Sequence, residues 1–174
     1  NILEIQQCPL WDKLKGKRVP ISFDLEITAR CNMGCRHCCI NLPANDTEAR
    51  QRELTPREIS GIADQATAMG AVWVLLSGGE PLLRDDFSEI YLILKHKGLL
   101  VSVFTNATFL RDEHMALFKK YPPRDIEITV YGASQETYER VTRRPGSFAA
   151  FTNGLNRLLD SGVRVRLKAM AIRS

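Results

Sequence analysis

The sequence of 174 residues contains no long hydrophobic run. Its longest apolar stretch is Ala71–Leu76, whereas about 18 consecutive apolar residues are needed to cross a bilayer. The first residues, Asn-Ile-Leu-Glu-Ile-Gln, lack the basic start and the apolar core of a signal peptide. From these absences we expect no membrane association and a cytoplasmic location.

The sequence also has little excess of positive over negative charge: 24 Lys and Arg against 20 Asp and Glu give a net charge of +4. So small an excess does not indicate nucleic acid as a partner. With 44% hydrophobic and 25% charged residues, the composition is that of a globular protein and excludes a disordered or collagen-like chain. The length suits one domain with a sizeable core.

Internal repeats, low-complexity segments and interdomain linkers are absent too, and the pattern alternates between strand and helix. Strands are predicted at 21–28, 71–77, 99–105, 125–130 and 163–171. Helices are predicted at 55–70, 86–98 and 111–120, followed by two that begin after caps at Ser134 and Ser147. The run at 71–77 is typical of a parallel strand covered on both faces. The stretch 41–54 is too polar to enter the core.

Strands that alternate with helices predict an α/β fold with a parallel sheet and right-handed crossovers. The chain supplies about four and a half βα units, whereas a closed barrel needs about eight units and ~250 residues. We therefore expect a partial TIM-type (β/α) barrel over residues 21–174 that is incomplete at its C-terminus. Residues 1–20 are expected to form an N-terminal extension.

Four of the five cysteines lie within nine residues, at Cys31, Cys35, Cys38 and Cys39. An odd number crowded in this way is a poor disulfide framework and favours a metal or cluster site. No second Cys-x-x-Cys motif closes a four-ligand zinc site, although His37, Cys39 or a partner chain are possible fourth ligands. Three thiolates also suit an iron–sulfur cluster with one open iron. The spacing favours the cluster and leaves zinc as an alternative.

Unusual residues follow each of the first four predicted strands. The cysteine loop follows strand 21–28, Gly78–Pro81 follows 71–77, Thr105-Asn106 ends 99–105, and Tyr131-Gly132 follows 125–130. Sites in parallel α/β sheets form at the carboxyl ends of the strands. The sequence therefore predicts one site that combines these segments.

The motif Cys31-x-x-x-Cys35-x-x-Cys38, together with Gly78-Gly79-Glu80-Pro81, resembles the signature of radical S-adenosylmethionine (SAM) enzymes. Residues 131–134 and 144–148 further resemble the branch of peptide and sulfatase maturases that carry a C-terminal SPASM region. The resemblance implies a [4Fe–4S] cluster on Cys31, Cys35 and Cys38 whose open iron binds SAM. It also implies reductive SAM cleavage to a 5′-deoxyadenosyl radical, which abstracts hydrogen from a peptide or protein side chain. A ferredoxin- or flavodoxin-type protein would donate the electron.

The same resemblance implies roles for residues around the cluster. His37 would stack near the adenine of SAM or pack beside the cluster. Gly78 and Gly79 would let the backbone approach the SAM amino group, because they lack a Cβ atom. Glu80, followed by Pro81, would accept hydrogen bonds from that ammonium or cap the next segment.

Further candidate cofactor contacts lie on later segments. Thr105 and Asn106 end their strand, and Thr129 offers a hydroxyl to the ribose or carboxylate of SAM. Arg140 is a candidate for binding the SAM carboxylate, with Arg143 and Arg144 as alternatives. Tyr131 stands where relatives frequently carry an aspartate, so any role of that carboxylate is in doubt here.

Alternation along the strands places charged residues together on one face of the sheet. The basic set is Arg164, Arg166 and Lys168, and the acidic set is Asp24, Glu26 and Glu127. Buried charges must be paired, so we predict a charge-paired barrel interior with Lys168 nearest the SAM end. The alternative is a solvated edge strand whose basic residues prevent self-association.

Two other functions remain open. One is a radical SAM enzyme that acts on a small molecule in cofactor biosynthesis. The other is a zinc-stabilised module that uses its basic strand to bind nucleic acid or a protein.

Overall fold

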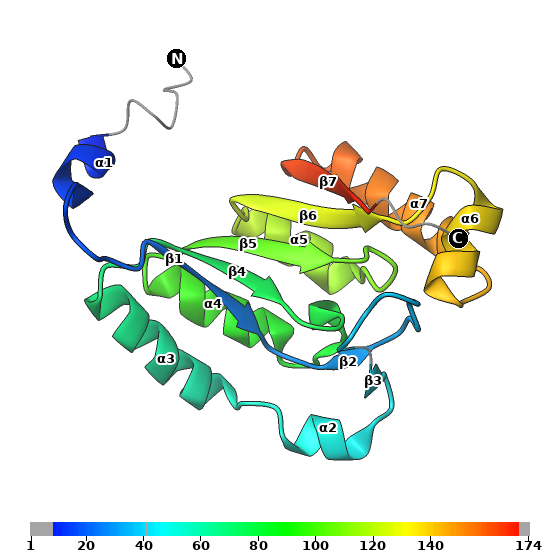
Figure 1. The fold of residues 1–174 in the computed structure, drawn as a ribbon, viewed down its shortest axis with the longest axis horizontal. Helices are drawn as coiled ribbons and strands as arrows, with labels where there is room; N and C mark the ends of the chain where they lie inside the picture. Colours follow the sequence, from blue (N-terminus) through cyan, green and yellow to red (C-terminus); the bar gives the residue numbers. More distant parts are fainter. Residues whose placement is uncertain (1–8, 41, 171–174) are drawn as a thin grey trace.

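The computed structural model describes residues 9–40 and 42–170. Its main feature is a parallel sheet with the strand order β1-β4-β5-β6-β7 (Figure 1). These strands are β1 (Ser22–Glu26), β4 (Trp73–Ser77), β5 (Leu100–Thr105), β6 (Asp125–Val130) and β7 (Val165–Ala169). Sequential order with parallel pairing throughout is the arrangement of a partial TIM-type barrel, which confirms the predicted fold class.

Helices α3, α4, α5 and α7 lie along one side of this sheet (Figure 1). The helices are α1 (Pro9–Leu14), α2 (Thr47–Gln51), α3 (Pro56–Ala68), α4 (Phe87–His96), α5 (Asp112–Lys120), α6 (Gln135–Thr142) and α7 (Ser147–Asp160). A short 3-10 helix, η2 (Pro81–Leu83), follows β4, and two short parallel strands, β2 (Arg30–Cys31) and β3 (Leu42–Pro43), flank the cysteine loop. None of the described helices is long and apolar enough to cross a bilayer.

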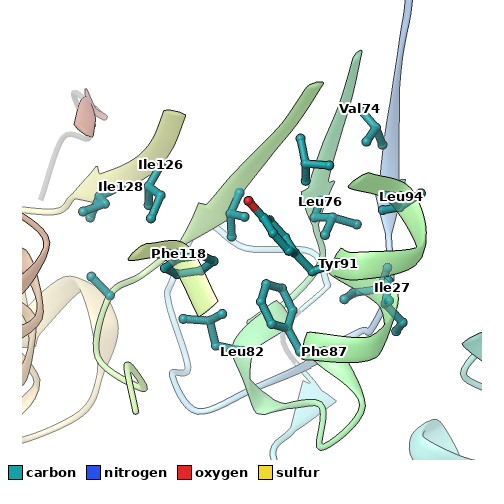
Figure 2. Packing of buried hydrophobic residues seen from close by; sticks show 14 of the residues in the cluster. Ile27, Val74, Leu76, Leu82, Phe87, Tyr91, Leu94, Phe118, Ile126 and Ile128 are labelled. Carbon is teal, nitrogen blue, oxygen red and sulfur yellow. The ribbon is translucent and has the colours of Figure 1, made fainter. Parts of the chain in front are cut away.

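The hydrophobic core lies between the helices and the sheet face that they cover (Figure 2). Phe87 and Tyr91 of α4 and Phe118 of α5 are fully buried and pack with ring centroids 5.7–6.2 Å apart. Val74 and Leu76 of β4 are buried, whereas their neighbours Trp73, Leu75 and Ser77 are only half-buried. The expectation that β4 is covered on both faces is therefore wrong for the described chain, because helices cover only one face.

The helix caps that the sequence predicts are confirmed for α3 and α6, but the predicted cap of α7 is wrong. The capping box of Thr55 and Glu58 opens α3, and Ser134 caps α6. The cap of α7 is Gly146 rather than Ser147, because Gly146 adopts a left-handed φ of 79° that only glycine takes without strain. The Ser147 hydroxyl instead pairs with that of Thr142 at 2.8 Å.

The polar stretch 41–54 holds β3 and α2, which the hydrophobic pattern does not predict. The buried Arg30 side chain anchors this stretch through a bidentate pair with Glu53, at 2.7 and 3.2 Å. Arg30 also donates to the Ala44 carbonyl, and Thr28 donates to Glu53.

The last predicted strand, 163–171, is observed as the shorter β7, and its predicted end at Ala171 lies outside the described residues.

Candidate metal and cofactor site

The cysteine loop and the ends of β4, β5 and β6 surround one pocket of about 270 Å³. The predicted site residues that line it are Cys31, Cys35, His37, Cys38, Gly78, Gly79, Thr105, Asn106 and Thr129. The structure thus brings together segments that are distant in sequence, at the sheet edge where the strand pattern predicts a site.

Backbone hydrogen bonds attach the start of the cysteine loop to the end of β4. Gly79 donates to the Thr28 carbonyl at 2.7 Å, and Glu80 donates to the Arg30 carbonyl at 2.9 Å. A Cβ atom on Gly78 would overlap the Thr28 carbonyl oxygen, and one on Gly79 would lie 2.7 Å from the Arg30 carbonyl carbon. The two glycines are therefore required for this close approach, whatever contact they make with SAM.

Glu80 is fully buried and connects two strand ends. Its carboxylate accepts from the Leu82 amide at 3.1 Å, from the Thr105 hydroxyl at 2.8 Å and from the Asn106 amide at 2.8 Å. Burial raises the pKa of Glu80 to about 7, although these three hydrogen bonds act in the opposite direction. The structure thus shows the capping contact, while the contact with the SAM ammonium stays a prediction.

Asn106 connects the end of β5 to the cysteine loop. Its side-chain amide donates to Asn32 at 2.9 Å and lies 3.8 Å from the Cys31 sulfur. On the other side of the loop, Gly34 and Arg36 donate to the carbonyls of Thr142 and Val141 at the end of α6. The loop that carries the thiols is therefore held from β4, β5 and α6.

Tyr131 lines the pocket, as the sequence analysis predicts from its place after the strand at 125–130, although it predicts no contact for the side chain. Its ring lies 5.4 Å from that of His37 and 5.5 Å from that of the buried Tyr138. A hydrogen bond from Tyr131 acts to lower the pKa of the Cys35 thiol, against the larger effect of burial, which raises it. Its position directly after β6 is the signal that identifies it as a site residue.

The donor set of this pocket fits an iron–sulfur cluster. Burial raises the pKa of Cys31 to about 12, so a thiolate there needs a nearby cation. In the described part of the chain, no three Cys, His, Asp or Glu side chains approach closely enough to share a single ion. Cys31, Cys35 and Cys38 nevertheless line the same pocket, and cysteine thiolates are the ligands that hold iron–sulfur clusters. His37 lines the same pocket, and its buried Nδ1 atom has no hydrogen-bond partner among residues 9–40 and 42–170.

Four predicted cofactor residues do not line the pocket, and the buried Glu80 described above is one of them. Pro81 is buried in η2 behind Glu80. Arg140 is exposed on α6 and lies 3.7 Å from Glu136, one helical turn earlier, so it faces away from the thiols. Lys168 lies 4.7 Å from the ring of Phe104, which itself lines the pocket.

Charged residues on β6 and β7 pair across the uncovered face of the sheet. Arg166 donates to the buried Glu127 and lies 3.4 Å from Asp125, and Lys168 also pairs with Glu127. Burial acts to raise the pKa of Glu127, but the hydrogen bonds from Lys168 and Arg166 hold it below its ordinary value.

The predicted charge pairing is therefore confirmed between β6 and β7. On β1, Asp24 and Glu26 are exposed, and within the described residues they form no ion pair. The predicted balance of three cations against three carboxylates is wrong, because Asp125 and Glu127 take the cations on the neighbouring strand.

Comparison with known proteins decides the family. The Radical SAM superfamily model matches residues 25–172, which include every strand of the main sheet except the first residues of β1. The chain belongs to the radical SAM superfamily. Members of this family use a [4Fe–4S] cluster and SAM, the group that the thiol set fits.

Two curated relatives are about one-third identical to the chain over the residues that align. The AdoMet-dependent heme synthase of Methanosarcina barkeri is 32% identical over 130 residues, which cover 75% of this chain and 36% of the relative. The mycofactocin maturase MftC of Mycolicibacterium smegmatis is 31% identical over 150 residues, which cover 85% of this chain and 36% of the relative. The chain thus spans about a third of the length of these proteins.

A solved structure with the same fold is Streptococcus suis SuiB bound to its precursor peptide SuiA. It matches with a TM-score of 0.73 at 18% identity, over 94% of this chain and 36% of SuiB. SuiB bound to S-adenosylmethionine matches with the same TM-score. At this identity the likeness shows the fold alone.

Proposed function

We propose that this chain is the SAM-cleaving core of a radical SAM enzyme, with Cys31, Cys35 and Cys38 as the cluster ligands. The observation that carries the proposal is the position of the three thiols around one pocket that also contains the ends of β4, β5 and β6. When bound, the [4Fe–4S] cluster and SAM supply reductive cleavage of the sulfonium to a 5′-deoxyadenosyl radical, which takes a hydrogen atom from the substrate.

The residues of the chain place and shield this chemistry. The thiols hold the metal, and Gly79, Asn106 and the end of α6 hold the loop that carries them. Thr129 presents a hydroxyl to the pocket, in a position to bind a ribose or carboxylate group. His37 and Tyr131 form an aromatic wall suited to a nucleoside base.

We further propose that the substrate is a peptide or protein side chain, modified in the cytoplasm. The relative MftC, a maturase, supports this substrate class, and SuiB, which shares the fold, was solved with a precursor peptide. A second candidate substrate is a tetrapyrrole, because the heme synthase of M. barkeri and an Fe-coproporphyrin III synthase of the same organism are similarly close, at 32% and 30% identity.

Anaerobic purification of the full-length protein tests the proposal. We expect a brown protein whose visible absorbance is bleached by dithionite and which releases 5′-deoxyadenosine from SAM. A colourless protein with one zinc per chain would refute the cluster and favour a zinc-stabilised binding module. Mass spectrometry of a peptide substrate and of a coproporphyrin, each incubated with the reduced enzyme and SAM, distinguishes the two substrate classes.

A further inference from the structure

A second hollow, a groove of about 470 Å³, is lined by the start of the cysteine loop, by residues 43–45 and by the two arginines that follow α6. Cys31 and Met33 line both the groove and the pocket, so this part of the loop borders both. A protein seated in the groove would therefore lie beside the proposed cluster ligand Cys31 without entering the pocket.

The groove is basic and carries no counter-charge. Arg143 and Arg144 line it, and its described lining includes no Asp or Glu. Both arginines are exposed, as is Arg36 on the neighbouring part of the loop. Among residues 9–40 and 42–170, none of these three guanidinium groups forms an ion pair with a carboxylate, unlike most of the other arginines in those ranges.

The nearest acidic side chain of this segment is already engaged. Glu139 accepts hydrogen bonds from the Gly146 and Phe148 amides, so its carboxylate stabilises the turn between α6 and α7. Arg143 ends α6 in the left-handed conformation, with φ 54°, and the Val141 and Thr142 carbonyls beside it hold the cysteine loop. The positive charges are thus attached rigidly to the loop that carries the thiols.

We propose that this groove is the docking surface for an acidic one-electron donor protein of the flavodoxin or ferredoxin type. The inference rests on the proposed function, because only a cluster at Cys31, Cys35 and Cys38 gives such a donor something to reduce. Arginines without partners attract an acidic surface and accelerate its association. In each encounter the reduced donor loses one electron and the cluster site gains one, and no bond forms or breaks.

The test measures binding of a purified acidic flavodoxin to the full-length protein. The double variant Arg143→Gln/Arg144→Gln removes two charges from the groove. Because each exposed charge contact contributes modestly, we expect about tenfold weaker binding at low salt. The matched control, Arg57→Gln/Lys119→Gln, removes two exposed charges from α3 and α5 and should bind like the natural protein. Figure 1 shows α3 on the opposite side of the molecule from α6.

Reduction by dithionite separates this inference from the proposed function. Arg143 and Arg144, which the sequence analysis offers as alternative SAM contacts, line the groove and not the pocket of the thiols. Dithionite should therefore reduce the cluster equally in the natural protein and the groove variant, whereas reduced flavodoxin should reduce only the natural protein at full rate. Failure of dithionite with the natural protein refutes the proposed function. Full reduction by dithionite, combined with undiminished flavodoxin binding in the groove variant, overturns the docking surface alone.

If the groove variant loses its cluster, the salt dependence of flavodoxin binding to the natural protein tests the docking surface instead. Affinity of the natural protein for flavodoxin should fall steeply between about 50 and about 300 mM salt, because exposed charges are screened. An affinity that is independent of salt, or equal weakening in the control variant, overturns the proposal. The proposal is also overturned if RNA or a substrate peptide binds tightly in the groove and thereby prevents flavodoxin from binding.

Discussion

Replacing Gly154 with alanine should destabilise the protein although it places a better helix former inside α7. Gly154 is buried against the loop that follows β5. An added Cβ would overlap the Ala107 carbonyl oxygen and lie 3.0 Å from its carbonyl carbon. Ala107 cannot readily move, because it is buried in the left-handed conformation with φ 60° and its amide donates to Thr105.

The two opposing effects of Gly154→Ala differ in size. Overpacking costs about 1–3 kcal/mol, and contact with constrained backbone places this case near the upper end. The gain in helix propensity is about 1 kcal/mol. We therefore expect a net loss of about 2 kcal/mol, which lowers the melting temperature of a domain this size by about 4–8 °C.

Thermal unfolding of the full-length protein measures this, with Gly61→Ala in α3 as the matched control. A Cβ on Gly61 meets nothing within 4 Å, so this variant should be stabilised by about 1 kcal/mol. Gly154→Ala should also bind less iron, because Asn106 precedes the displaced alanine and contacts the cysteine loop. Equal stability of Gly154→Ala and Gly61→Ala would refute the close approach of α7 to the loop that follows β5.

Other predictions concern the thiols, a buried ion pair and pH. Cys35→Ala should abolish iron binding and SAM cleavage, whereas Cys39→Ala should keep both; the reverse result would overturn the ligand assignment. Glu53→Gln leaves the buried Arg30 without its carboxylate, whereas Arg84 keeps Asp86, and the variant should lose about 3 kcal/mol in chemical unfolding; exposed Glu48→Gln should cost nothing measurable. Burial lowers the pKa of His114 to about 4, so protonation favours unfolding, and stability should fall by about 2 kcal/mol from about pH 7 to about pH 5. His114→Gln should lose that dependence, and an unchanged pH profile would contradict it.

The sequence predicts the elements whose information is local. The strands follow from apolar runs, and the start of α3 follows from a capping box contained within four residues. The position of the site at the strand ends follows from parallel topology alone. These signals need no knowledge of what lies across the molecule.

The features that escape prediction depend on partners distant in sequence. Arg30 and Glu53 bury each other's charge, and neither residue type in isolation indicates burial. The contacts of Glu80 with β5 and the outward position of Arg140 likewise depend on how neighbouring elements pack. The pairing of Asp125 with Arg166 depends on strand order, which makes β6 rather than β1 the neighbour of β7.

The backbone bonds that frame the cysteine loop also impose an order on biosynthesis. The loop is made early, but the glycines that follow β4, the side-chain amide of Asn106 and the end of α6, which hold the loop, are all made later. Domains fold largely as their residues leave the ribosome. We therefore expect the thiols to become a defined site only after α6 has emerged, so that iron–sulfur delivery is a late event in the maturation of this protein.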